Sequence, residues 1–89
     1  MTTENLLKIR TIGVTIIHKQ LTAIIEREGD GFVSFCPELD IASQGVTIEE
    51  ARKNLKEALE LFFESASTAE IGTRLSDEVY VTTVEVALG

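Results

Sequence analysis

The 89-residue sequence has only one cysteine and one histidine, and no long apolar run. A lone cysteine closes no disulfide within the chain, so a reducing compartment, the cytoplasm, is the expected location. No apolar run reaches the ~18 residues of a membrane-spanning helix. Lys8 and Arg10 interrupt the N-terminal segment, and no cleavage site of small residues follows, so no signal peptide is predicted.

The remaining composition is that of a small globular protein. Hydrophobic residues make up 44% and charged residues 26% of the chain, which argues against disorder. The length predicts one domain with a thin core, because chains this short bury only about 60 to 65% of their unfolded surface.

Negative charge is in excess and unevenly spread. The net charge is −7. Residues 1–20 have three basic side chains and one acidic, a balance of +2, whereas residues 21–89 have five basic and fourteen acidic, a balance of −9. A surface of this charge repels phosphate, so direct nucleic-acid binding is not expected. It would attract a basic partner and accelerate the encounter.

Alternating apolar and polar residues predict most of the strands. The predicted strands are residues 10–17, 21–27, 32–36, 41–44 and 79–86. A glycine-containing turn, residues 28–31, joins the second to the third. Pro37 lacks an amide donor and therefore ends the third strand.

The segment after Gly45 has a clear helix start. Thr47 is a good N-cap, and Glu50 three residues later completes a capping box. Apolar residues then recur at three- and four-residue steps and form one stripe: Ile48, Ala51, Leu55, Ala58, Leu59, Phe62, Phe63 and Ala66. Residues 65–68 weaken the helix, and one more short helical turn is considered for residues 69–75.

The predicted fold class is therefore α+β. A small sheet in the order β-β-β-α-β has one helix packed on one face, with a possible additional strand in front. We divide the chain into an N-terminal extension, residues 1–18, and a domain, residues 19–89.

Candidate catalytic groups have simpler explanations. A nucleophile needs a positioned base, and Cys36 lies in a strand expected to be buried, where single cysteines serve as small core residues. A two-metal nuclease needs converging carboxylates, but the strand centres are apolar and the acids lie in loops. Gly29 and Gly31 have no following Lys-Ser/Thr pair and suit a tight turn rather than a phosphate loop. No enzyme activity, metal or cofactor is therefore expected.

A composite pattern carries a family resemblance. The run GDGFVSFCPELDIASQGVTIEEARKNLKEALELFFE has a glycine turn, Val33–Cys36, Pro37-Glu38-Leu39, Ser43-Gln44-Gly45 and a capped helix. In this order the pieces resemble the HicB family of antitoxins in its short, single-domain, UPF0150-type form. The resemblance covers residues 19–64, and residues 79–88 fit the closing strand of short members.

The resemblance implies a degenerate ribonuclease H-like fold. It also implies binding to a small basic toxin, HicA, an endoribonuclease that acts on mRNA and is neutralised when the antitoxin covers its active site. Homodimers or tetramers are implied as well. Longer members carry a C-terminal DNA-binding domain, which is not expected here. Residues 1–18 precede the usual start of short members and are either an assembly strand or a tail.

Two function classes follow. The first is a HicB-like antitoxin of a type II toxin-antitoxin system, whose candidate toxin-facing or interface residues lie in loops: Asp30, Glu38, Leu39 and Asp40. The second is an orphan HicB-fold structural or regulatory oligomer that has no toxin partner. A basic neighbouring open reading frame would favour the first class.

Overall fold

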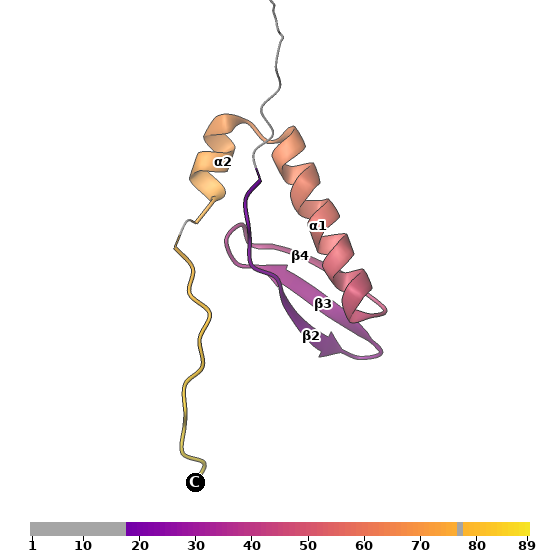
Figure 1. Cartoon of the computed structure of the whole chain (residues 1–89), viewed down its shortest axis with the longest axis vertical. Helices are drawn as coiled ribbons and strands as arrows, with labels where there is room; N and C mark the ends of the chain where they lie inside the picture. Colours follow the sequence, from indigo (N-terminus) through magenta and orange to yellow (C-terminus); the bar gives the residue numbers. More distant parts are fainter. Residues whose placement is uncertain (1–17, 77) are drawn as a thin grey trace, which may run out of the picture.

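The computed structural model describes residues 18–76 and 78–89 (Figure 1). Three strands are followed by two helices: β2 (Ile24–Glu28), β3 (Gly31–Cys36), β4 (Ile41–Gly45), α1 (Ile48–Ser65) and α2 (Thr68–Arg74). The predicted α+β class is confirmed, and the predicted short turn after the main helix is α2. The predicted front strand at residues 10–17 lies outside the described residues.

The three strands form one antiparallel sheet in the order β2-β3-β4. Its register aligns Ile25, Ser34 and Ser43 on one face and Ile24, Phe35 and Ala42 on the other. Gly29 has a positive φ of 61° in the β2–β3 turn, a conformation that glycine adopts without steric cost.

Helix α1 covers the sheet face that carries Ser34 and Cys36 (Figure 1). The core is small, as the length predicts: Cys36, Leu39 and Leu55 are nearly inaccessible and pack together. The Ser34 hydroxyl donates a 2.8 Å hydrogen bond to the Ala51 carbonyl, which fixes α1 on the middle strand.

The predicted cap of α1 is confirmed with one difference. The Thr47 hydroxyl accepts the Glu50 N–H at 3.0 Å. The Glu50 carboxylate accepts the Val46 N–H at 2.6 Å, one residue before the cap. The side chain therefore ties the helix to the connection that leaves β4.

The predicted last strand does not form part of the sheet. Residues 78–89 belong to no strand of the described structure, and most of their side chains are exposed (Figure 1). Alternating, β-branched residues favour extended backbone. A strand must also pair with a neighbouring strand, and the alternation carries no information about which segment that neighbour is. Within the described residues, no helix is long and apolar enough to span a membrane.

Candidate functional site

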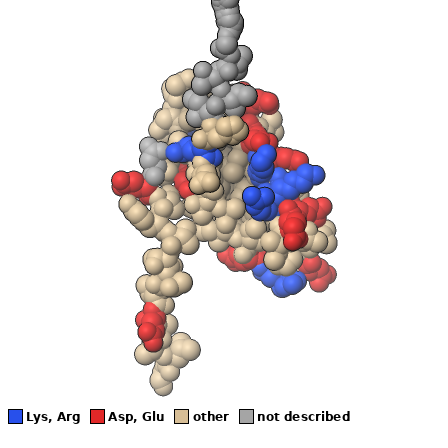
Figure 2. All heavy atoms as spheres, in the orientation of Figure 1, with Lys and Arg blue, Asp and Glu red and all other residues tan. Residues whose placement is uncertain are grey.

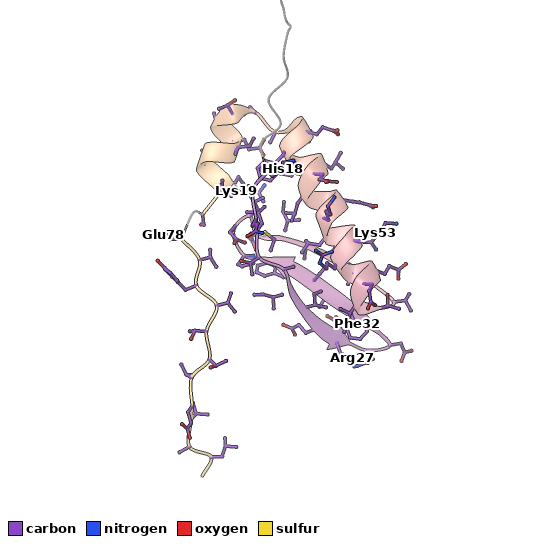
Figure 3. The ribbon with its side chains drawn as sticks, in the orientation of Figure 1. His18, Lys19, Arg27, Phe32, Lys53 and Glu78 are labelled. Carbon is purple, nitrogen blue, oxygen red and sulfur yellow. The ribbon has the colours of Figure 1, made fainter. Side chains whose placement is uncertain are left out.

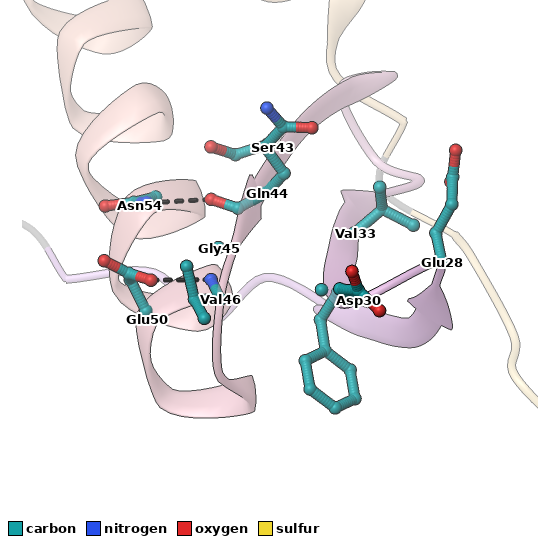
Figure 4. A pocket seen from close by; sticks show the side chains of 11 residues that line it. Glu28, Asp30, Val33, Ser43, Gln44, Gly45, Val46, Glu50 and Asn54 are labelled. Atoms are coloured by element: carbon teal, nitrogen blue, oxygen red, sulfur yellow. Dashed lines mark hydrogen bonds between the residues drawn. The ribbon is translucent and has the colours of Figure 1, made fainter.

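An open, acidic hollow lies where the β2–β3 turn faces the β4–α1 junction (Figure 4). Three carboxylates, those of Glu28, Asp30 and Glu50, line it, and none of its lining residues is Lys or Arg. The other lining residues are Gly31, Phe32, Val33, Ser43, Gln44, Gly45, Val46 and Asn54. We call this surface the acidic hollow.

Two glycines allow the walls of the acidic hollow to approach closely. A Cβ on Gly31 would stand 2.8 Å from the Gly45 carbonyl oxygen. A Cβ on Gly45 would stand 2.5 Å from the Ala51 nitrogen and 2.7 Å from the Glu50 carbonyl carbon. The Asn54 side chain donates a 2.8 Å hydrogen bond to the Gln44 carbonyl and holds α1 against β4 (Figure 4).

The acidic hollow is suited to a cationic side chain of a partner. The Glu50 carboxylate is engaged by Val46, whereas Glu28 and Asp30 lie exposed at the turn. The Arg27 guanidinium stacks on Phe32 at 4.6 Å from the ring centroid, beside the hollow. Among the described residues, no cluster of three or more His, Cys, Asp or Glu is arranged to hold a metal ion.

The four predicted site residues do not form one cluster. Asp30 precedes β3 and lies in the acidic hollow, whereas Glu38, Leu39 and Asp40 follow β3 at its other end. Leu39 is 1% exposed, and its side chain belongs to the core. Asp40 is exposed and has a positive φ of 57°.

Glu38 is held by contacts inside the molecule. Its carboxylate accepts the Thr22 N–H at 3.0 and 3.1 Å and the Thr22 hydroxyl at 2.6 Å. The Cys36 thiol donates to the same carboxylate at 3.3 Å. Burial raises the pKa of Glu38, but these hydrogen bonds outweigh it and leave the pKa below its ordinary value of 4.5. The arrangement favours a structural role for this carboxylate.

Sequence reasoning missed Glu28 and treated Glu50 only as a cap residue. The available signal was the hairpin register, which pairs Glu28 with Gly31 and brings Phe32 opposite Gly45. The register places the turn beside the start of α1, and no local motif reports that proximity.

A second surface lies between residues 18–23 and the two helices. Its floor is apolar and includes Leu21, Leu55, Leu59, Phe63, Ile71 and Leu75. Its rim includes one histidine, His18, three basic side chains, Lys19, Arg52 and Lys56, and one acid, Glu60. In the space-filling view Lys and Arg atoms gather over α1, and His18 and Lys19 lie beside the same helix (Figures 2 and 3). We call this surface the β2 groove.

Comparisons with known proteins assign the family. No protein-family model matches the chain, and no solved structure does. A UPF0150 protein of Helicobacter pylori (strain J99) is 32% identical over 68 residues, which cover 75% of this chain and 94% of that protein. The chain belongs to the UPF0150 family.

A second UPF0150 protein, from Synechocystis, is 46% identical over 57 residues, covering 58% of this chain and 72% of that protein. UPF0150 is the HicB-like family, so the predicted resemblance is confirmed. This UPF0150 protein has two distinct candidate surfaces, the acidic hollow and the β2 groove.

Proposed function

We propose that this UPF0150 protein is an antitoxin that binds and neutralises a small basic HicA-like mRNA endoribonuclease. Membership of the HicB-like family is the observation that carries the proposal. The acidic character of residues 21–89 supports it, because a basic partner is attracted by such a surface. The proposal gives the chain no catalytic step of its own.

The acidic hollow is the proposed contact for a basic side chain of the toxin. A nuclease that binds RNA needs Lys and Arg to neutralise phosphates. The exposed carboxylates of Glu28 and Asp30 offer those cations an alternative partner. Charge-assisted hydrogen bonds of this type are shorter and stronger than neutral ones. The carboxylates of the antitoxin would then compete with RNA phosphates for the Lys and Arg side chains of the toxin.

A charge-reversal experiment tests this contact. The double variant Glu28→Lys/Asp30→Lys is compared with Glu64→Lys, an exposed acid near the opposite end of α1. The toxin candidate is any small basic protein that a neighbouring open reading frame is found to encode, and calorimetry measures its affinity for each variant. We expect the double variant to bind at least about tenfold more weakly, or about 1.4 kcal/mol, with Glu64→Lys near wild type. Equal affinities for all three proteins would refute the assigned contact.

The second candidate function is a structural or regulatory oligomer without a toxin. Five exposed apolar side chains near the C-terminus favour it, because such a surface calls for a covering partner: Tyr80, Val81, Val84, Val86 and Leu88. The two candidates separate on one observation. An orphan domain self-associates and leaves every basic neighbouring protein unbound, whereas an antitoxin forms a complex with one.

A further inference from the structure

Residues 78–88, here called the C-terminal segment, are extended but pair with no strand among the described residues. One face of the segment is formed by even-numbered residues and is mostly apolar. On that face Tyr80 is 83%, Val84 81%, Val86 68% and Leu88 92% exposed. The opposite face begins with Val79 and Val81, of which Val81 is 64% exposed, and continues with Thr83, Glu85 and Ala87.

Such a segment is unusual on a small isolated domain. Val, Tyr and Thr are the residues that sheets favour. Unpaired extended backbone with an apolar face is a template for pairing with another chain. The composition thus indicates a strand whose neighbour is not among the described residues of its own chain.

The described residues include an unpaired sheet edge of the matching kind. Strand β2 is an edge of the sheet in the described structure, so every second residue directs its backbone groups away from β3. Helix α1 packs mainly against β4 and only slightly against β2. The β2 groove continues this edge toward the N-terminus, because its wall is residues 18–23, which lead directly into β2, and its floor is apolar.

The charges of the two surfaces are complementary. The C-terminal segment has Glu78 and Glu85 and no Lys or Arg. The rim of the β2 groove has three basic side chains, Lys19, Arg52 and Lys56, and one acid, Glu60, which pairs with Lys56 at 2.7 Å and leaves an excess of positive charge. Opposite charges across an interface favour one partner and register over others.

The chain is anchored shortly before the C-terminal segment, at Arg74 and Ser76. The Arg74 guanidinium donates to the Leu39 carbonyl at 2.7 Å, and the Ser76 N–H donates to the Glu38 carbonyl at 2.9 Å. From there the segment diverges from β2 (Figures 1 and 3). Eleven extended residues span about 36 Å, which is enough to lie along the β2 edge of a neighbouring copy.

We propose that the C-terminal segment of each chain adds as a strand to the β2 edge of a second copy, with its even-numbered side chains in that copy's β2 groove. Donor and acceptor belong to the same sequence, so two copies exchange segments reciprocally and close as a two-fold dimer. The exchange does not depend on the proposed antitoxin function.

A matched pair of full-length variants tests the packing. Val84→Lys places a charge on the apolar face, opposite a basic rim, and Thr83→Lys places the same charge on the other face. Light scattering measures the mass across a dilution series. We expect Val84→Lys to raise the dimer dissociation constant at least about tenfold and Thr83→Lys to leave it nearly unchanged. Circular dichroism verifies that both variants fold. Equal dimerisation of both folded variants would overturn the proposal.

Isotope-filtered nuclear Overhauser spectra identify which chain the segment contacts. Labelled and unlabelled wild-type chains are unfolded, mixed and refolded together. We expect contacts between residues 80–88 of one chain and residues 21–27 of the other. Contacts only within a chain, a monomer at all concentrations, or a segment ordered only when a different protein is added would each overturn the proposal.

Discussion

Thr22 and Glu38 lie sixteen positions apart and are joined by bonds from both the amide and the hydroxyl of Thr22 to the Glu38 carboxylate. The Glu38 carbonyl also accepts the Ser76 N–H at 2.9 Å. One residue thus connects the segment before β2, the β3–β4 loop and the chain leaving α2. Glu38 fixes the point from which the C-terminal segment departs.

Glu38→Gln is expected to destabilise the fold near neutral pH. The substitution removes charge-assisted bonds, and the expected loss in the free energy of unfolding is about 1 to 2 kcal/mol. Because the folded pKa lies below its ordinary value of 4.5, the carboxylate contributes stability above that value and loses it as pH falls through the folded pKa. Urea unfolding at neutral and acidic pH measures the difference, which should shrink in acid. A difference independent of pH would contradict this account, and Glu57→Gln is the exposed control.

Gly45→Ala is expected to separate α1 from β4. The new methyl group would lie 2.5 Å from the Ala51 nitrogen, closer than real Cβ contacts allow. We expect a loss of about 1 to 3 kcal/mol in unfolding free energy, measured by urea titration. Gly72→Ala is the matched control, because open space surrounds that position within α2. It should raise stability by about 0.5 to 1 kcal/mol, and equal effects from both substitutions would contradict the close approach.

Cys36 is expected to react slowly with thiol reagents in the native protein. Its side chain is 0% exposed, and burial raises the pKa of the thiol above its ordinary value of 9.0. The thiolate is the reactive form, so modification should follow local or global opening of the core. A disulfide-exchange reagent measures the rate with and without denaturant. Rapid modification under native conditions would show that Cys36 is accessible.

Toxin association is expected to depend on salt. The net charge of −7 accelerates the encounter with a basic protein. Exposed charges are screened over about 10 Å at 0.1 M salt, so the association rate should fall several-fold between low and moderate ionic strength. Stopped-flow mixing measures the association rate. A rate that does not change with salt would contradict the claim that electrostatic attraction accelerates binding of the toxin.

Local patterns in the sequence predicted β3, β4 and α1 well. The glycine turn, Pro37 and the Thr47 cap each act within a few residues, and β3, β4 and α1 lie close to the predicted bounds. The strand predicted at residues 21–27 begins three residues later, at Ile24. Thr22 in that gap gives its backbone N–H to Glu38 rather than to a strand.

The candidate site was less predictable because it depends on proximity between distant segments. Asp30 was predicted as a toxin-facing or interface residue from its loop position, whereas Glu50, which lines the same hollow, belongs to another element. Leu39 was predicted as an interface residue, and the structure places its side chain in the core. The alternating pattern of residues 79–86 predicts extended backbone. Which strand such a segment pairs with depends on tertiary or quaternary contacts, which the local pattern does not contain.

The central claim, neutralisation of a HicA-like nuclease, is tested most directly by an RNA cleavage titration. A small basic protein encoded by a neighbouring open reading frame, once one is identified, is incubated with RNA and increasing amounts of the UPF0150 protein. We predict that cleavage falls to background near stoichiometric amounts and that Glu28→Lys/Asp30→Lys shifts the titration to higher concentration. Undiminished cleavage at large excess of the wild-type protein would contradict the account.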